Sequence, residues 1–552
     1  MKIKTYVLLP FSLLILASIS AQTPASAILN VNNVKVQVNA NGALFTDFTD
    51  GQFIAPYEPG QPEISTMRAS GIWLGGFDPA GNIKGAIHAY NENGKADFQP
   101  GILDDVTGTA TGQLTQIYRV TKADIEEHLA DFHDNFVIDN PNPNVFGWPA
   151  VYNPYFSQYH NGETLPATSQ GLADFWDENS DGVYNPTHGD FPIIGVRGCD
   201  EAPPHYADEM LWFVFNDEML HTQSLLLPIR MEVQCQIFAF NCQEAPLGNT
   251  IFARYKMINR AGEDLDSAYV GVFADFDIGN PNDDFIGSDS LRSIVFGYNG
   301  DDNDEAGYGN HAPAMAIDLI RGPLDEDRNE LPLTHVMPIE GALPTTLTNP
   351  NGPYNLLAGH YEDGTSAPNN GYFYNGDPND PSAWTEVTEG NTPGDRKVVG
   401  SYGPFKLQPG AVNELILAYS FHQEPDNSNL ENVTTMYKQT DQVQALFDNC
   451  FDIATAIACT PNVTGIFEVE AENLSIYPNP ATDAITIELP ETLQGPIALT
   501  DLTGRQLLSV DYPIGSKSTQ LNVSGFPQGM YVIVAKGKDG TIFRQKVILS
   551  DF

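Results

Sequence analysis

The amino-acid sequence predicts a mainly β protein: a large, loop-rich β body with a few helices, followed by a C-terminal seven-stranded, immunoglobulin-like β-sandwich. Its 48 Gly and 40 Pro favour turns and short strands over long helices. Hydrophobic residues at 41% and aromatic residues at 11% supply enough apolar surface for packed cores. Because single cores stop growing at roughly 250–300 residues, the 552-residue chain is expected to form at least two domains.

The first 21 residues have the features of a secretory signal peptide. Lys2 and Lys4 precede an apolar stretch, and small residues end the segment at Ala21, with Ala27 as the alternative cleavage site. No later apolar run approaches the roughly 20 residues needed to span a bilayer. We therefore expect an exported mature protein without a transmembrane segment.

The body is expected to cover residues 22–455. Its first signals are an alternating strand at 34–38 and a hairpin at 71–90 with its turn at 78–82. Thr121 and Asp124 have capping-box spacing, which predicts the start of a helix. Later apolar or alternating runs predict strands at 210–217, 230–240, 250–258, 269–278 and on either side of a turn at 407–410, and a closing helix at 430–447. The pattern also allows two modules joined near residues 174–190.

A linker at 456–472 leads to the C-terminal module, residues 473–552, where seven short strands in about 80 residues predict a small sandwich. Four motifs stand in order there: YPNP (477–480), DLTGRQLL (501–508), FPQGMYVIV (526–534) and FRQKVILS (543–550). In this combination the segment resembles a type A C-terminal sorting domain of the type IX secretion system of Gram-negative bacteria. The alternative is an ordinary immunoglobulin-like sandwich, for example an adhesive one.

The resemblance implies export through the periplasm to the outer-membrane surface or the medium. The expected partners of residues 473–552 are the type IX secretion machinery and its sorting peptidase, and the released body would be a candidate for attachment to surface lipopolysaccharide. Body segments such as GIWLGGFDPAGN (71–82) and LWFVFNDEMLHT (211–222) resemble long secreted proteins of bacteria that use this system. That second resemblance implies no activity and transfers no catalytic residues.

The formal net charge of −45 excludes one class of partner. Nucleic-acid affinity comes largely from cations that neutralise phosphates, so we expect no nucleic-acid binding. The acidic excess lies almost entirely upstream of residue 472. Most of these carboxylates are expected to solvate the surface, and some to bind divalent cations.

The segment DENSDGVYNPTHGD, residues 177–190, predicts a structural calcium loop. It reproduces the first half of an EF-hand-type loop through Asp177, Asn179, Asp181 and the carbonyl of Val183. His188 replaces the usual bidentate Glu, so Asp190 or Asp174 would supply the last carboxylate. The alternative is an Asx-rich turn bound only to water.

A second acidic cluster contains Asp275, Asp277, Asp283 and Asp284. Alternation along a strand places Asp275 and Asp277 on one side, and like charges this close need a cation or a raised pKa. Three interpretations stay open: a second Ca²⁺ site, a solvated strand end, or a carboxylate pair for glycoside hydrolysis.

No catalytic residue can be nominated, because HExxH, GxSxG, P-loop and dinucleotide-binding patterns are missing from the sequence. Tyr372, Tyr374 and Trp384 in a long loop would suit a glycan or another surface ligand, or would simply anchor the loop. The preferred hypothesis is a calcium-stabilised binding or structural module, and the alternative is a secreted polysaccharide-degrading hydrolase.

Spacing suggests two disulfides, Cys235/Cys242 and Cys450/Cys459, which would leave Cys199 unpaired. For the first pair, two buried thiols without a bridge are the alternative.

Overall fold

The computed structural model describes residues 24–90, 94–199, 205–242, 246–305, 307–339 and 349–450 of the body. In the C-terminal part it describes residues 475–479, 481–488, 497–500, 506–510, 516–536 and 542–550. The predicted signal peptide and linker lie outside these residues. The chain divides into two compact units, Met1–Pro461 and Asn462–Phe552, and each is described by itself.

The larger sheet of the body has nine antiparallel strands. Their order is β14 (Asp284–Asp289), β15 (Ile294–Asn299), β18 (Ala314–Arg321), β21 (Val412–His422), β12 (Thr250–Asn259), β11 (Met231–Ala239) and β10 (Glu209–Asn216), with β6 (Gln99–Pro100) and β7 (Tyr118–Thr121) both paired to β10. Strands far apart in the sequence meet at its centre, since β12 pairs with β21.

The second large sheet has five strands and carries the candidate site. Its order is β19 (Leu333–Ile339), β20 (Arg396–Leu407), β13 (Leu265–Phe276), β4 (Met67–Phe77) and β5 (Ile83–Ile87). The smaller sheets are β1 (Ser26–Leu29), β2 (Lys35–Asn39) and β3 (Phe53–Ile54); β8 (Phe175–Trp176) with β9 (Phe191–Pro192); and β16 (Asn303–Asp304) with β17 (Gly309–Asn310). The predicted mainly β fold is therefore confirmed.

The main hydrophobic core lies between the two large sheets. On β11, Val233, Cys235 and Ile237 belong to this core, whereas the alternate residues Glu232, Gln234 and Gln236 make polar contacts elsewhere. The same alternation supplies core residues from β10, β12, β13, β20 and β21. A sheet-on-sheet sandwich results, with both outer faces still to be covered.

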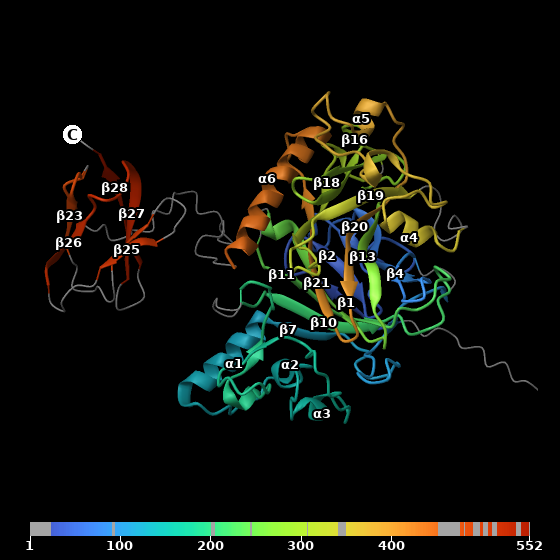
Figure 1. The fold of residues 1–552 in the computed structure, drawn as a ribbon, viewed down its shortest axis with the longest axis horizontal. Coiled ribbons are helices and arrows are strands. Elements are labelled where there is room, and N and C mark those ends of the chain that lie inside the picture. Colours follow the sequence, from blue (N-terminus) through green and yellow to red (C-terminus); the bar gives the residue numbers. More distant parts are fainter. Residues whose placement is uncertain are drawn as a thin grey trace, which may run out of the picture. The chain divides into compact units, whose positions relative to one another are not determined.

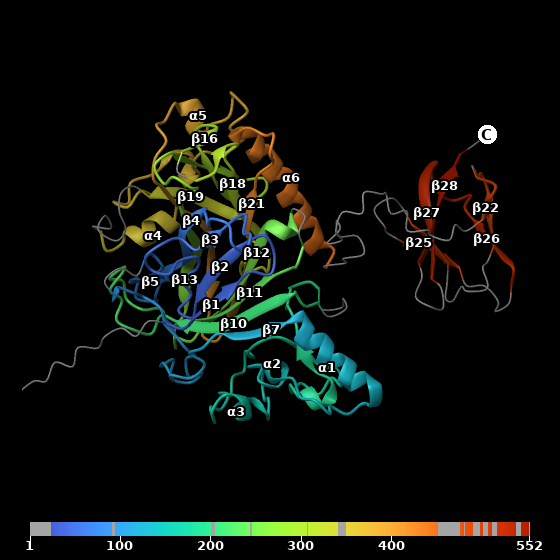
Figure 2. The same cartoon turned by 180° about the vertical axis from the view of Figure 1, so that it is seen from behind.

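Helices and loops cover those outer faces. Helix α6 (Asn429–Asp448) lies along the nine-stranded sheet, where Val433 and Met436 pack on β15 and β18. Helix α4 (Gly352–Leu357) packs on the outer side of β4 and β13. Figures 1 and 2 both show α1 (Lys122–Asn135), α2 (Pro143–Phe146) and α3 (Phe156–Tyr159) in a lobe at one end of the body, while α5 (Glu386–Glu389) lies at the other.

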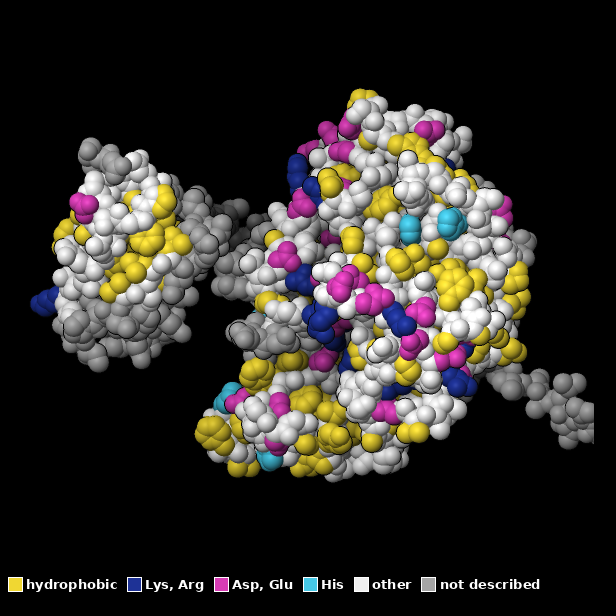
Figure 3. All heavy atoms as spheres, in the orientation of Figure 1, with side chains coloured by type: hydrophobic (Ala, Val, Ile, Leu, Met, Phe, Trp, Pro, Cys, Tyr) yellow, Lys and Arg dark blue, Asp and Glu magenta, His cyan; other side chains and the backbone are white. Residues whose placement is uncertain are grey.

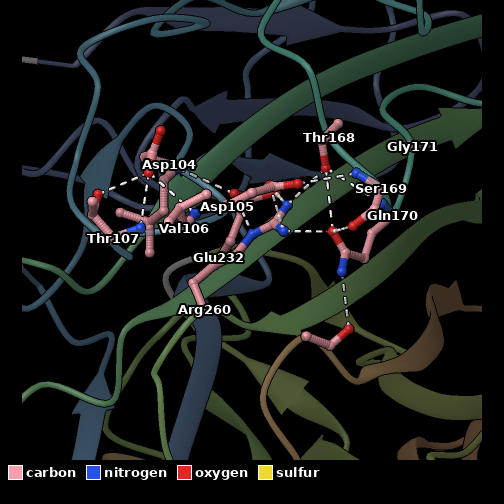
Figure 4. Close-up of polar contacts among 12 residues, drawn as sticks. Asp104, Asp105, Val106, Thr107, Thr168, Ser169, Gln170, Gly171, Glu232 and Arg260 are labelled. Atoms are coloured by element: carbon pink, nitrogen blue, oxygen red, sulfur yellow. Dashed lines mark hydrogen bonds and ion pairs between the residues drawn. The ribbon is translucent and has the colours of Figure 1, made fainter.

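A buried ionic network joins this lobe region to the large sheet (Figure 4). Arg260, which follows β12 and is 5% exposed, donates from Nε and Nη2 to the Glu232 carboxylate at 3.1 and 2.9 Å. Its Nη1 lies 2.6 Å from Asp105, and Thr168 accepts a hydrogen bond from Nη2 at 3.1 Å. One guanidinium group therefore ties two loops of the lobe region to β11 and β12.

The C-terminal unit contains two sheets among its described residues. One is β22 (Ile476–Tyr477), β23 (Ala484–Glu488) and β26 (Ser518–Asn522). The other is β25 (Gln506–Val510), β24 (Ile497–Thr500), β27 (Gly529–Lys536) and β28 (Ile542–Leu549). They share one apolar cluster that includes Ile485, Leu499, Leu521 and Ile533. Immunoglobulin-like topology stays a prediction.

The predicted disulfides are wrong. Cys199 and Cys450 form a disulfide across a sequence separation of 251, and Cys235 is a free thiol. Cys242 is also disulfide-bonded. Cys235 cannot bond to Cys242 because the Cys235 side chain faces the core between the sheets. Cys450 follows α6 and reaches the turn that contains Cys199.

Among the described residues, no helix combines the length and the hydrophobicity needed to cross a membrane. On the face of the body shown in Figure 3, the Lys and Arg side chains lie beside Asp and Glu side chains.

Candidate metal centre

Three carboxylates meet where β13 ends and β20 begins. Asp275 is the penultimate residue of β13, Asp277 follows that strand, and Asp395 immediately precedes β20. One oxygen from each lies within 4.8 Å of the others. The antiparallel register pairs Asp275 with Lys397, and alternation along both strands brings Asp277 and Asp395 to the same place. Hereafter these three residues are called the Asp275 group.

The Asp275 group lies at the edge of the interior. Asp275 is 3% exposed, Asp277 is half-buried and Asp395 is exposed. The Tyr90 hydroxyl donates to Asp275 Oδ2. Lys397 Nζ contacts the Asp395 carboxylate and lies 3.9 Å from Asp275 Oδ1, and that buried oxygen accepts no hydrogen bond from any described residue. An orphaned, buried carboxylate oxygen fits a bound cation.

The electrostatics point the same way. Burial, together with the charge of Asp277, raises the pKa of the Asp275 carboxyl to about 7. Burial, together with the charge of Asp395, raises the pKa of Asp277 to about 6. Lys397 lowers both pKa values and Arg68 lowers that of Asp277, but neither cation offsets the upward shift. The Asp275 group could therefore hold a metal ion, and its hard oxygen donors suit Ca²⁺ or Mg²⁺.

Asp283 and Asp284 lie beside the Asp275 group and are not part of it. Asp284 begins β14, is fully buried, and accepts a hydrogen bond from the Ile278 amide at 3.1 Å. Asp283 accepts from Asn280 Nδ2 at 2.8 Å. Burial, with the charges of Asp283 and Asp277 added, raises the pKa of Asp284 well above its usual value.

The 177–190 loop adopts a tight Asx-rich conformation. The Asp177 carboxylate accepts from the amides of Asp181 and Gly182 at 3.1 and 2.7 Å. Asn179 Nδ2 donates to Asp181 Oδ2 at 3.0 Å, and Asp181 Oδ1 accepts from the Val183 amide at 2.8 Å.

Asp190 hydrogen-bonds to two backbone amides of the loop. It is fully buried and accepts from the amides of Glu178 and Asn185 at 2.9 and 2.7 Å. Burial raises the pKa of Asp190 to about 6, and the nearby charges of Asp177 and Asp181 add to the shift. The charges of Asp177 and Asp181 therefore act on Asp190, but among the described residues only the Asp275 group brings three acidic ligand atoms within 4.8 Å of one another.

Sequence reasoning missed Asp395, Lys397 and Tyr90. The alternation of Asp395 and Lys397 is visible in the sequence and is the signal that could have nominated them. Their place next to Asp275 depends on the pairing of β13 with β20, which no local pattern specifies.

Comparisons with known proteins identify the C-terminal segment. Residues 475–550 match the family described as "Secretion system C-terminal sorting domain". The resemblance of this segment to a type IX sorting domain is thus confirmed, so the class is that of proteins exported to the cell surface or the extracellular space. Residues 475–550 therefore carry a secretion sorting domain, and the body lies outside the matched residues.

Comparisons of the whole chain add no argument about the body. No curated protein sequence matches it. Among solved structures, a polysaccharide lyase matches at 8% identity with a TM-score of 0.18, covering 58% of this chain and 34% of that one. A GH36 alpha-galactosidase from Geobacillus stearothermophilus in complex with stachyose matches at 9% identity with a TM-score of 0.20, covering 44% and 27%. The chain thus spans about a third or less of each protein's length.

Proposed function

We propose that the body is a calcium-stabilised binding or structural module that the sorting domain delivers to the cell surface or the medium. The observation that carries the proposal is the convergence of Asp275, Asp277 and Asp395 around a buried oxygen without a hydrogen-bond partner. A divalent cation there neutralises the carboxylate charge that Lys397 and Arg68 leave unbalanced.

Calcium is the proposed ion because the donors are carboxylate oxygens on the end of one strand and the start of another. Ca²⁺ accepts six to eight oxygen ligands in flexible geometry, whereas Mg²⁺ demands near-ideal octahedral geometry. Asp275, Asp277 and Asp395 would hold the ion, and solvent would complete its coordination. The chemistry it supplies is charge neutralisation that fixes β13 against β20.

The 177–190 loop is the second proposed calcium site. Asp177, Asn179, Asp181 and the Val183 carbonyl would be its ligands, with Asp190 as the nearby carboxylate that replaces the missing Glu. The proximity of Asp177 and Asp181 to the fully buried Asp190 supports this assignment. Asp283 and Asp284 are proposed to add negative charge beside the first site rather than to ligate.

For the C-terminal segment, the proposed partners are the secretion machinery and its sorting peptidase, with lipopolysaccharide as the proposed surface anchor. The proposed organisation is a signal peptide at 1–21, a body at 22–455, a linker at 456–472 and the sorting domain at 473–552. A division of the body into two modules near 174–190 stays a prediction.

One observation favours the alternative, a hydrolase acting on polysaccharide. Asp275 and Asp277 have pKa values of about 7 and about 6, the range that a general acid needs. Against it, Asp275 is 3% exposed, and the neighbouring cavity is lined by Asp395 and Lys397 rather than by Asp275 or Asp277. A carboxylic acid that cannot reach a glycosidic oxygen cannot protonate it. The hydrolase would become the preferred hypothesis if the wild type releases reducing ends from a polysaccharide and Asp275→Asn abolishes this release without loss of stability.

Metal analysis and thermal unfolding of the purified full chain test the calcium proposal. We expect bound calcium, and a melting temperature that EDTA lowers by about 2–5 °C and that added calcium restores. The Asp275→Asn/Asp277→Asn variant should lose one ion and most of the EDTA effect. The matched control, Glu58→Gln/Asp134→Asn, replaces two exposed carboxylates. It should keep the bound ion and the full effect of EDTA on the melting temperature. A calcium-free protein with an EDTA-insensitive melting temperature refutes the proposal.

A further inference from the structure

A cavity of about 760 Å³ lies next to the Asp275 group. Its walls come from β14, β19, the start of β20 and the loops at 361–365 and 373–391. The supporting elements α5, β19 and β20 lie in the same part of the body in Figure 1. This volume falls within the range of about 300–1,000 Å³ that is usual for small-ligand sites.

Aromatic rings form one wall of the cavity. Tyr361, Phe373 and Tyr374 line it, and Trp384 supports them from behind, with its ring centroid 5.4 Å from those of both Phe373 and Tyr374. Tyr361 is 42% exposed and has its ring centroid 6.2 Å from that of Phe373. The exposed ring of Tyr361 offers a face on which the C–H side of a sugar ring can stack.

The fold holds Tyr374 in place at an energetic cost. Its φ of +51° is a left-handed conformation that bulky residues rarely adopt. Two contacts keep it there: its carbonyl accepts from the Ser288 amide at 2.9 Å, and Asn391 Nδ2 donates to its hydroxyl at 3.0 Å. Strain retained by such contacts is a reason to look for function at this residue.

The charges in the cavity are largely paired with one another. Glu386, 1% exposed, accepts from Arg396 Nε and Nη2 at 3.0 and 2.9 Å, and Lys397 contacts Asp395. Four acidic residues (Glu362, Asp363, Glu386 and Asp395) and two basic ones (Arg396 and Lys397) line the cavity. The acidic excess disfavours anions, whereas the paired, fixed polar groups suit uncharged hydroxyls.

We propose that this cavity binds a neutral saccharide, with Tyr361 and Tyr374 stacking on its rings and Asn391, Asp395 and Arg396 positioned for its hydroxyls. The proposal rests on the proposed function of the body as a binding module and names its ligand class. A charged glycan is not the expected ligand, because the lining carries no unpaired cation among the described residues.

Affinity electrophoresis of the full chain tests this binding. Native gels in calcium buffer would contain starch, xylan, galactomannan or mixed-linkage β-glucan as neutral probes and polygalacturonate as the acidic probe. We expect retardation by at least one neutral polysaccharide and none by polygalacturonate. Tyr361→Ala should weaken that binding about tenfold, while Tyr361→Phe, which keeps the ring, should retain it. Tyr152→Ala, at an exposed tyrosine elsewhere, should bind like the wild type.

Three results overturn the proposal: no retardation by any neutral polysaccharide, retardation that Tyr361→Ala leaves unchanged, or binding only to polygalacturonate or to an oligolysine peptide in the same assay. The calcium proposal is judged separately, from metal content and melting temperature. Retardation of a protein that contains no calcium would support the saccharide site and refute the calcium proposal. Bound calcium without retardation would support the calcium proposal and refute the saccharide site.

Discussion

Asp275 and Lys397 lie directly opposite each other on β13 and β20, with Lys397 Nζ 3.9 Å from Asp275 Oδ1. Both side chains are almost fully buried. Lys397 is thus the internal counter-charge of the Asp275 group, and the balance between this ammonium and a bound cation decides the stability of the site.

Replacing Lys397 therefore tests the site directly. In EDTA, Lys397→Met should lower the free energy of unfolding by about 3–5 kcal/mol, because it leaves buried carboxylates unpaired. Calcium should recover more of this loss than it adds to the wild type, since the variant site is more negative. Denaturant unfolding with and without calcium measures both quantities. Lys406→Met, which removes a half-exposed lysine paired with Asp264 and Asp266, is the control and should cost less than about 1 kcal/mol with no calcium dependence.

The Cys199–Cys450 disulfide should be a large contributor to stability. Its sequence separation of 251 closes a long loop, so the chain-entropy estimate is about 5–6 kcal/mol. Guanidinium unfolding of Cys199→Ser/Cys450→Ser under oxidising conditions measures the loss. Cys235→Ala, which removes the free thiol, should cost only about 1 kcal/mol. Equal stability of the double variant and the wild type would contradict this assignment.

The Arg260 network predicts strong coupling between Arg260 and Glu232. Arg260→Met leaves the fully buried Glu232 without its guanidinium partner and should cost about 3–5 kcal/mol. Arg260→Met/Glu232→Gln should recover part of that loss, and a double-mutant cycle gives the coupling energy. Arg230→Met is the control, because its pair with Glu218 is near the surface and should contribute below about 1 kcal/mol. Additive single-variant effects would show that the network is not a unit.

Acid should destabilise the body through His88. Burial lowers the pKa of this fully buried imidazole to about 4. Between pH of about 6.5 and 4, the imidazole is protonated in the unfolded chain but not in the folded chain. As the pH decreases over this range, His88 therefore lowers the free energy of unfolding by about 3 kcal/mol.

Because several buried carboxylates have raised pKa values and act in the opposite sense, the effect is read from a comparison of variants. The stability deficit of His88→Gln relative to wild type should shrink as the pH falls from 7 to 4. His133→Gln, at an exposed histidine of α1, is the matched control. A constant deficit for His88→Gln would contradict the prediction.

Deleting residues 473–552 should stop export at the periplasm. Cell fractionation followed by immunodetection of the body would locate the truncated chain. The control is the melting temperature of the truncated chain, because it shows whether the body still folds after the deletion. Normal surface display of the truncated chain would refute the sorting assignment for this protein.

Local signals in the sequence were sufficient for individual elements. The capping box of Thr121 and Asp124 begins α1 as predicted, and the turn at 407–410 separates β20 from β21. Each signal lies within a few residues of the structure it specifies, so propensity and turn chemistry decide it.

Long-range relationships were not accessible in the same way. Asp275 and Asp277 were nominated because strand alternation is local, but Asp395 and Lys397 join them only through the register between β13 and β20. The predicted disulfides are wrong for the same reason. Sequence spacing favours Cys235 with Cys242, but the direction of Cys235 into the core and the position of Cys450 after α6 depend on tertiary packing.

The covalent bond between Cys199 and Cys450 also determines how the body bears mechanical load. Cys450 lies two residues after the end of α6, so a pull applied to the chain at that point acts on the disulfide before it acts on the helix. Without the disulfide, pulling would peel α6 from the sheet one turn at a time. With it, the force passes to the turn at Cys199 and is shared by the sandwich, where strands resist together rather than in sequence.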